Sequence, residues 1–282
     1  MIMSYKAKKK IKSALIRLVI LLIVFIDVYP LFWMITASFK APGEFVTNPA
    51  YALNAGFYLK NYVEAWTRGK MALFFKNSLI CTVVSLFLII ILTLTSSFAL
   101  TKMRWKGRTF FDKYFAFGIM IPVAIALIPL FQIYSRSNLL NTRTCLIITY
   151  IAFGLSLSIY LVQGYLRSFP DDIMEAAVID GCGIYRLMWH IVTPLMKNSI
   201  VTVLVLQFFF KWNDLLFSMT FISDSALKTV QTGLLYFSDE FGSKNWGAIF
   251  ASVSMSVFPL LILYMALNKK LMEGMTAGAV KG

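Results

Sequence analysis

Six apolar segments, each close to the length of a bilayer-spanning helix, constrain this chain more than any other feature of its sequence. A bilayer core of about 30 Å requires about 20 mostly apolar residues in a helix. The fourth segment is the shortest, but its flanks can extend it. We therefore predict an all-α integral membrane protein with six transmembrane helices. The segments are residues 18–38, 79–100, 115–134, 145–162, 199–219 and 246–267.

The composition agrees with a membrane protein. Of the 282 residues, 59% are apolar and 14% are charged, whereas about a quarter of the residues in an average soluble domain are charged. A net charge of +14 would suggest nucleic acid in a soluble protein, but here we expect the cations to orient the chain in the bilayer and expect no nucleic-acid partner. Cys81, Cys145 and Cys182 are scattered, so we expect no disulfide framework, metal site or cofactor.

The basic residues predict the orientation of the chain. The first apolar segment follows the run KAKKKIK, but it is too long for a cleaved signal peptide and lacks a small-x-small cleavage site, so we expect an uncleaved span. An even number of spans places both ends on one side, and the positive-inside rule places that side in the cytoplasm. We predict one transmembrane domain over 1–282, with the N-terminal segment 1–17, a long inner loop 165–198 and the tail 268–282 in the cytoplasm.

The inner loop contains an unusual acidic stretch, DDIMEAAVIDG, at residues 171–181. Pro170 suits the first position of a helix, and the carboxylates that follow it suit the positive end of the helix dipole. Gly181 is a natural stop, so we predict a short helix over residues 170–180. The helix dipole then accounts for much of the acidic charge, and a functional role for these carboxylates remains a separate possibility.

A second short helix should follow the corner at 181–183. Ile184, Leu187, Met188, Ile191 and Val192 recur at helical spacing and form one apolar stripe. We expect Thr193 to cap a further helix that begins at Pro194 and continues into the fifth span. Two helices joined by a glycine corner form a rigid knob that can enter the groove of a partner.

These residues resemble a known motif. Glu175, Ala176 and Ala177, then Gly181, then Ile191 and Pro194 resemble the EAA motif of the permease subunits of binding-protein-dependent ABC importers, with Thr193 where that motif usually has Leu. The resemblance implies that the knob is a coupling helix seated in a cleft of a cytoplasmic ATPase subunit. The implied coupling residues are Glu175, Ala176, Ala177, Asp180, Gly181, Ile191 and Pro194.

The resemblance covers nearly the whole chain and is closest to the carbohydrate-uptake permeases of the maltose-type second subunit. NSLICTVVS, KMRWKGR, IPVAIALIPLF, WNDLLFS and the tail EGMTAGAVKG all look like that group. It implies the ABC type I importer permease fold, with a cytoplasmic coupling helix between the fourth and fifth transmembrane helices. It also implies a tail that reaches into the ATPase dimer, through Gly274, Gly278 and Lys281. On composition alone these glycines would only mark a flexible end.

The resemblance also implies the partners and the location of the protein. They are a second, homologous permease subunit, two ATPase subunits, an extracytoplasmic sugar-binding protein and a sugar, in the lipid of a bacterial cell membrane. No GxxxxGK[ST] loop occurs in the chain, so ATP hydrolysis must belong to a partner and the chain itself is not expected to be an enzyme.

Polar residues within the spans are candidates for the substrate path, because charges there are costly. Lys211 and Asp214 lie one turn apart, and mutual neutralisation explains them better than substrate contact. Phe208, Trp212 and Tyr134 could stack on sugar faces, although membrane aromatics more often face lipid or core. Pro122 and Pro129 could kink the third span or merely bend it. The substrate-path candidates are Gln132, Gln207, Trp212, Asn213 and Asp214, with Asp27 and Pro30 as weaker ones.

Two alternatives to sugar import remain open from the sequence. One is an ABC importer for a non-sugar solute, such as a glycerol phosphodiester or a polyamine. The other is a secondary carrier or channel, for which ionisable relays or paired inverted repeats would be expected near the midplane.

The outer loop, residues 223–245, reads as a solvated connection, and by resemblance it would meet the sugar-binding protein.

Overall fold

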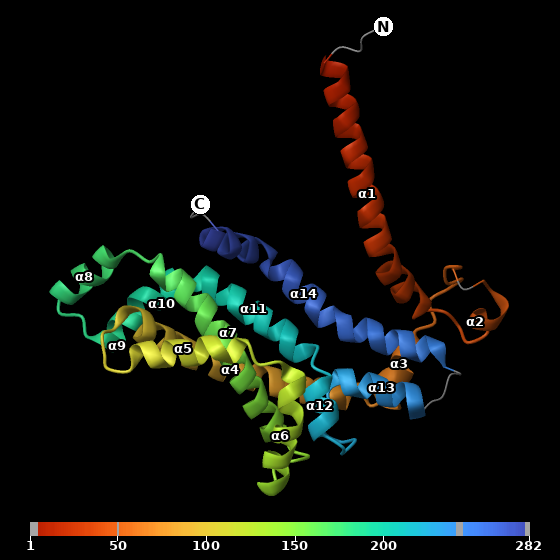
Figure 1. Cartoon of the computed structure of the whole chain (residues 1–282). Helices are drawn as coiled ribbons and strands as arrows, with labels where there is room; N and C mark the ends of the chain where they lie inside the picture. Colours follow the sequence, from red (N-terminus) through yellow and green to blue (C-terminus); the bar gives the residue numbers. More distant parts are fainter. Residues whose placement is uncertain (1–4, 50, 241–244, 280–282) are drawn as a thin grey trace. The chain divides into compact units, whose positions relative to one another are not determined.

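The structure, a computed structural model, describes residues 5–49, 51–240 and 245–279, and every regular element within these ranges is a helix (Figure 1). The predicted all-α fold is therefore confirmed. The chain falls into two compact units, residues 1–70 with 236–255 and residues 71–235 with 256–282. Two helices, α13 (Val230–Glu240) and α14 (Trp246–Ala279), begin in one unit and end in the other.

The first unit consists of α1 (Tyr5–Ala37), α2 (Glu44–Thr47), α3 (Lys60–Thr67) and the adjoining parts of α13 and α14. The buried side chain of Asn61 donates to the carbonyl oxygens of Ser38 and Lys40 at 2.9 and 2.8 Å. Backbone N–H groups of Ala41 and Ala55 donate to the carboxylate of Glu44 and lower its pKa. These bonds fix the loops that follow α1.

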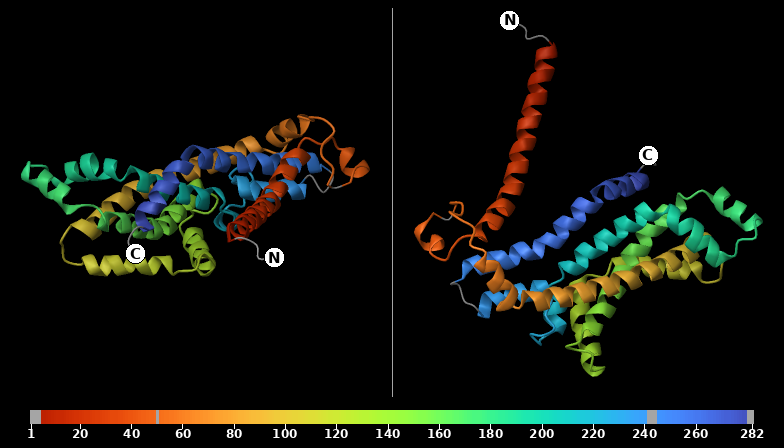
Figure 2. Two further views of the ribbon diagram at one scale, coloured as in Figure 1. Left: turned by 90° about the horizontal axis from the view of Figure 1, so that it is seen from above. Right: turned by 180° about the vertical axis from the view of Figure 1, so that it is seen from behind.

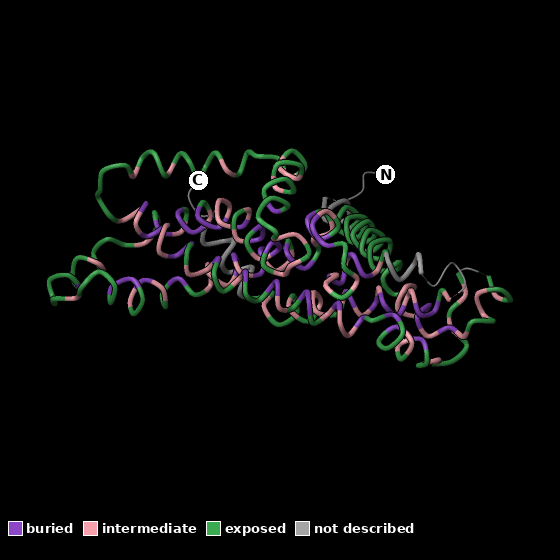
Figure 3. Tube along the Cα trace, turned by 90° about the horizontal axis from the view of Figure 1, so that it is seen from below, coloured by how far each residue is buried: buried purple, intermediate pink, exposed green. Residues whose placement is uncertain are grey.

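Helix α1 is apolar and exposed over residues 11–32, and only its end, residues 33–37, is covered by the chain (Figure 3). A helix that is hydrophobic all round belongs in a membrane or a large protein core. Because none of the most apolar 18 residues of this helix is buried by the chain, its surface is left for lipid or for a neighbouring subunit.

The second unit is built on two long helices, α4 (Met71–Lys102) and α7 (Arg143–Arg167), which lie along each other with α11 (Lys197–Trp212) beside both (Figure 2). Gly154 on α7 permits this approach. A Cβ at this position would lie 2.6 Å from Cδ1 of Ile89 on α4 and 3.1 Å from Oε1 of Gln207 on α11. Ile89 and Gln207 are buried and cannot swing into solvent.

We expect Gly154→Ala to loosen this packing and to lower the thermal midpoint of the purified protein. Overpacking a tight site typically costs about 1–3 kcal/mol. Gly164→Ala is the matched control, because Gly164 lies on the same helix and has nothing within 4 Å of its Cβ position. It should leave the midpoint unchanged or raise it, since Ala favours a helix over Gly by about 1 kcal/mol. Heating in detergent followed by size-exclusion chromatography measures the midpoints of both variants. Equal midpoints would contradict the close approach of α4 and α11 to α7 at Gly154.

By length and composition, four helices of the described chain can cross a membrane and two bent helix pairs can bring the number to six. The four are Ile11–Ala37, Met71–Lys102, Arg143–Arg167 and Trp246–Lys269, and they contain the first, second, fourth and sixth predicted segments, apart from Ser38 at the end of the first. The bent pairs contain the third segment and most of the fifth.

The third predicted segment, 115–134, is not one continuous helix. It belongs to α5 (Arg108–Ile119) and α6 (Val123–Arg136), which meet at 104°. Pro122 lies at this break with an extended backbone and precedes the first residue of α6. Pro129 lies inside α6, which continues through it, so only one of the two prolines marks a break.

The fifth predicted segment, 199–219, is also interrupted. Helix α11 ends at Trp212, and α12 (Leu216–Phe221) begins after a short link. The outer loop 223–245 is not merely a connection, because it contains α13. Hydrophobicity alone cannot reveal these breaks, since the residues on both sides of each one are apolar.

The inner loop forms the predicted knob with three corrections. Helix α8 is Asp171–Ile179, so Pro170 precedes the helix with an extended backbone instead of occupying its first turn. The second helix is α9 (Ile184–Arg186) followed by a π-helix, η1 (Leu187–Val192). Thr193 does not cap the next helix: its backbone is helical, it begins α10 (Thr193–Leu195), and its buried hydroxyl has no hydrogen-bond partner.

Candidate functional site

The helical knob, residues 169–196, is fastened to the ends of α4 and α7. Ala177, Leu187, Met188, Val192 and Met196 are buried in one hydrophobic cluster. That cluster also contains Phe98 and Leu94 of α4 and Val162 and Leu166 of α7. Burial of a side chain of this kind contributes about 1.5–3 kcal/mol, so the knob is held as a rigid extension of the two helices.

Lys102, the last residue of α4, adds a polar clamp to the knob. Its ammonium donates to the carbonyl oxygen of Phe169 at 3.1 Å and to the carboxylate of Asp171 at 2.7 Å. The lysine side chain is largely buried while Asp171 remains exposed. Asp171 therefore has a structural partner on α4 besides its place in the first turn of α8.

A glycine corner joins the two halves of the knob. Gly181 has φ +78°, its N–H donates to the carbonyl of Val178, and the N–H of Cys182 donates to that of Ala177. This pair of bonds is the Schellman motif that ends many helices, and it requires a left-handed residue, which is usually Gly. Gly183 has ordinary extended angles, φ −70° and ψ 158°.

The knob exposes an apolar surface on both sides of this corner. Ile179 is 85% and Tyr185 78% exposed. Exposed apolar patches of this kind mark interaction sites in soluble regions of proteins. We call this set the knob surface: Ile173, Val178, Ile179, Ile184, Tyr185 and Trp189.

The predicted coupling residues divide between the two faces of the knob. Glu175, Ala176, Asp180, Gly181 and Pro194 are exposed. Ala177 is buried and Ile191 is half-buried, and both pack in the cluster that fastens the knob. Of the predicted tail residues, Gly274 and Gly278 lie within α14, not in an irregular end, and Lys281 lies outside the described residues.

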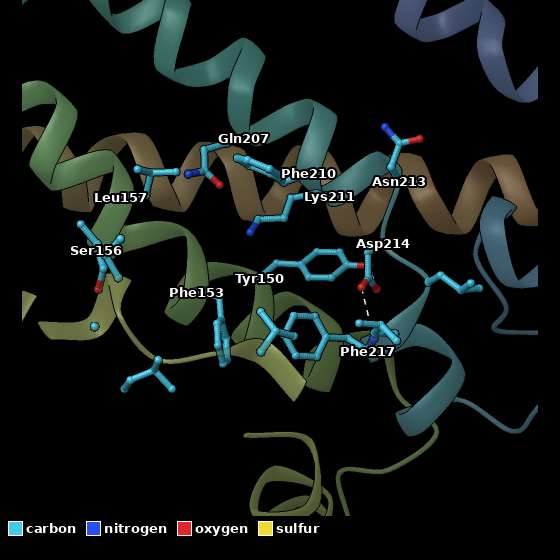
Figure 4. Close-up of a pocket in the computed structure, with 16 residues that line it drawn as sticks. Tyr150, Phe153, Ser156, Leu157, Gln207, Phe210, Lys211, Asn213, Asp214 and Phe217 are labelled. Atoms are coloured by element: carbon cyan, nitrogen blue, oxygen red, sulfur yellow. Dashed lines mark hydrogen bonds between the residues drawn. The ribbon is translucent and has the colours of Figure 1, made fainter. Parts of the chain in front are cut away.

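A cavity of about 430 Å³ lies in the second unit, where both broken helices meet α7 (Figure 4). Its wall comes from the α5–α6 break, the middle of α7, the end of α11, and the link to α12. Irregular backbone at membrane depth is found where it lines a cavity or is buried in protein. The side chains used below are Tyr150, Phe153, Gln207, Phe210, Lys211, Asp214 and Phe217.

Asp214 organises one wall of this cavity. Its carboxylate accepts hydrogen bonds from the hydroxyl of Tyr150 at 2.8 Å and from the backbone N–H groups of Phe217 and Ser218 at 3.1 and 3.0 Å. The last two bonds cap the start of α12 in the manner of an N-cap residue. Asp214 thus joins α7 to α12 across the break after α11.

Lys211 and Asp214 do not form an ion pair. The two ion pairs of the described chain are Lys60–Glu64 and Lys102–Asp171. The ammonium of Lys211 lies 5.6 Å from the ring centre of Tyr150, a cation–π arrangement. The mutual neutralisation expected from the sequence is therefore not a direct pair. The ammonium of Lys211 lies over the ring of Tyr150, and the carboxylate of Asp214 binds the start of α12.

Three of the five predicted path residues, Gln207, Asn213 and Asp214, line the cavity. Gln132 is exposed on α6 and does not line it. Trp212 is buried against Phe208, and its indole N–H donates to the carbonyl of Ser256. It is a packing residue of the helix bundle.

Sequence reasoning missed three residues that the structure brings into these sites. Tyr150 lies inside an apolar segment that gave no polar signal. Lys211 was explained better by neutralising Asp214 than by substrate contact, and Lys102 entered only as part of the stretch KMRWKGR. A lysine at the end of a span, opposite a helix that starts with acids, could have suggested the clamp.

Comparison with known proteins identifies the family. Residues 90–276 match the family described as "Binding-protein-dependent transport system inner membrane component", and the chain belongs to that family. It is a multi-pass transport subunit of the ABC importer type, not an enzyme. The chain is 30% identical to the diacetylchitobiose uptake system permease protein NgcG of Streptomyces coelicolor, over 91% of this chain and 85% of that protein.

A second relative and a solved structure agree with this assignment. The chain is 31% identical to the probable starch degradation products transport system permease protein AmyC of Thermoanaerobacterium thermosulfurigenes, over 89% of this chain and 91% of that protein. A chain in the crystal structure of a bacterial ABC transporter that imports the acidic polysaccharide alginate superposes with a TM-score of 0.81 at 20% identity, over 95% of this chain and 99% of that one. The type I importer permease fold is thereby confirmed.

Proposed function

We propose that this chain forms half of the translocation path of an ATP-driven importer for an oligosaccharide or another sugar, and that it couples the path to a cytoplasmic ATPase. The relatives named above are described as permeases for diacetylchitobiose and for starch degradation products, which supports a sugar over a non-sugar solute. The observation that carries the coupling half of the proposal is the knob, which is buried on one face and exposes apolar residues on the other.

The knob is suited to transmit force because its fastening and docking faces are separate. Ala177 and Ile191 hold it to the bundle, and the Lys102 clamp fixes its first turn. The exposed coupling residues, Glu175, Ala176, Asp180, Gly181 and Pro194, together with the knob surface, would enter the ATPase cleft by helix-in-groove packing. Movement of the ATPase would then move α4 and α7 directly.

The assembly we propose contains this chain, a second homologous permease, two ATPase subunits and an extracytoplasmic sugar-binding protein. The chain acts as one permease domain over 1–282 in a bacterial cell membrane, with both termini in the cytoplasm. In that arrangement the tail, with Gly274, Gly278 and Lys281, lies on the ATPase side. The positive-inside distribution of Lys and Arg supports this orientation.

Transport would proceed by alternating access. ATP binding closes the ATPase pair, the knobs approach, the cavity opens outward, and hydrolysis resets it. The nucleotide must bind one state far better than the other, because a ligand with equal affinity for both states shifts nothing. The cavity residues Gln207, Asn213 and Asp214 would face the passing sugar.

Uptake by the native host provides the test. A strain that lacks this gene should lose ATP-dependent uptake of at least one labelled oligosaccharide in a panel of neutral and acidic di- and trisaccharides, and the wild-type gene should restore it. Glu175→Lys should lower the restored uptake at least about tenfold, which corresponds to about 1.4 kcal/mol of docking free energy. Asp172→Lys is the matched control, since both residues are exposed acids of α8.

The results distinguish the rival functions. Uptake that survives ATP depletion would indicate a secondary carrier. If the gene restores uptake of a glycerol phosphodiester or a polyamine and of no sugar, the chain belongs to a non-sugar importer. Equal loss in Glu175→Lys and Asp172→Lys would contradict a specific docking role for Glu175.

A further inference from the structure

We propose that the cavity binds an acidic group of the transported sugar, such as the carboxylate of a uronic acid, and that Lys211 selects it. This inference rests on the proposed function and adds the substrate class. It depends on the position of one buried cation and on the hydrogen bonds that occupy the neighbouring anion.

Lys211 presents an unpaired ammonium to the cavity. The residue is only 8% exposed, it lines the cavity, and neither ion pair of the described chain includes it. The ring of Tyr150 lies 5.6 Å from the ammonium, and the carboxylate of Asp214 acts on it only through space, from beyond ion-pair distance. Figure 4 shows the ammonium directed away from Asp214 into the space bordered by Phe153 and Ser156. A buried cation of this kind requires an acceptor.

Asp214 is the only acidic residue of the cavity wall, and its oxygens are already occupied. One oxygen accepts from Tyr150 and Ser218, and the other accepts from Phe217. Its hydrogen bonds therefore go to the start of α12 and to a phenol, and none of them comes from Lys211, whose N–H donors face the cavity. Asp214 thus holds the cavity wall in place, whereas the ammonium of Lys211 faces the space that a ligand would occupy.

The rest of the wall suits a sugar that carries such a group. Oε1 of Gln207, a residue that is 2% exposed, has no hydrogen-bond partner, whereas its Nε2 donates to Gly154 and Ser158. A buried acceptor without a donor fits a hydroxyl group. Phe153, Phe210 and Phe217 supply apolar faces for a sugar ring. The volume of about 430 Å³ lies within the range of small-molecule sites.

The sign of the charge favours an acid over the other ligand classes. A carboxylate would form a charge-assisted hydrogen bond with the ammonium, which is about twice as strong as a neutral one. A neutral sugar could offer only a hydroxyl, and a polyamine would place a second cation against Lys211 in a region of low dielectric. The cavity is thus matched to an anionic sugar and unsuited to a cationic solute.

The test compares acidic sugars with their own neutral esters in the native host. Cells that lack the gene are complemented with wild type, Lys211→Gln, Lys211→Arg or the surface control Lys60→Gln. Uptake is measured for labelled di- and trisaccharides of galacturonate, mannuronate and glucuronate, each beside its methyl ester, and for neutral maltotriose and diacetylchitobiose. Immunoblots of membranes confirm equal amounts of each variant.

We expect wild type to import at least one acidic sugar better than its ester, and Lys211→Gln to raise the KM for that acid about tenfold or more. Lys211→Arg should retain most of the preference and Lys60→Gln all of it. Import of neutral sugars alone, or an equal loss of acid and ester uptake in Lys211→Gln, would overturn the inference and leave the proposed function standing. The equal loss would indicate that Lys211 pairs with a neighbouring subunit. Failure to import any sugar would remove the proposed function, and this inference with it.

Discussion

Gly181→Val should abolish uptake while the protein still inserts into the membrane. The residue ends α8 in the left-handed region, with φ +78°. An L-residue in that region costs about 1–2 kcal/mol, and a β-branched one fits there worst. Valine would therefore displace the Schellman bonds to Val178 and Ala177, and the two halves of the knob surface would no longer lie in the arrangement that one cleft can receive.

The control for this substitution is two residues away. Gly183 has extended angles that any residue adopts, and nothing lies within 4 Å of its Cβ position. Gly183→Val should thus retain uptake close to wild type, although it adds the same side chain to the same corner. Gly181→Asn should retain more uptake than Gly181→Val, because Asn tolerates the left-handed region.

The measurements are uptake by complemented cells, the amount of protein in membranes, and co-purification of the ATPase. Gly181→Val should be present in normal amounts but should recover little ATPase. Normal ATP-coupled uptake by Gly181→Val would contradict the role of the corner. Equal loss in Gly183→Val would show that added bulk, and not backbone geometry, is what the ATPase cleft rejects.

The sequence predicted the elements of this fold better than their interruptions. Runs of apolar residues located the four continuous spans, one bent helix pair and most of the other, because the bilayer sets one length for every helix that crosses it. Two prolines offered a break in the third segment, and their local sequence did not say that Pro122 and not Pro129 would mark it. The link after Trp212 is held by a tertiary contact, the bond from Tyr150 to Asp214, which joins residues far apart in the chain. Periodicity within a segment contains no information about such contacts.

The same distinction applies to the sites. The knob could be predicted because its signals are local: the acidic first turn of α8, the glycine corner and the apolar stripe that ends at Val192. The cavity could not, because its wall combines α7 with two helix breaks. Lys211 illustrates the difference, since proximity in sequence suggested a pair with Asp214, whereas the carboxylate binds Tyr150 of another helix.

Asp214→Ala should lower the thermal stability of the purified protein more than any other substitution considered above. It removes the acceptor of three hydrogen bonds, from Tyr150, Phe217 and Ser218. A buried donor left without a partner costs about 1–3 kcal/mol, and loss of a helix cap costs about 1 kcal/mol. It also leaves Lys211 buried without a nearby anion. Asp224→Ala is the matched control, because Asp224 is exposed and binds only the N–H of Ala226 through its side chain.

The double variant Asp214→Ala with Lys211→Met separates these contributions. If the orphaned cation accounts for part of the loss, the double variant should unfold at a higher temperature than Asp214→Ala alone. The carboxylate of Asp214 acts on the ammonium through space without an ion pair, and a buried charge that loses its compensating charge is costly, whereas the double variant buries neither charge. Thermal midpoints in detergent, for wild type, both single variants and the double variant, complete the cycle. A double variant as unstable as the sum of the single ones would show that Lys211 and Asp214 act independently, with Asp214 stabilising the fold only through Tyr150 and the start of α12.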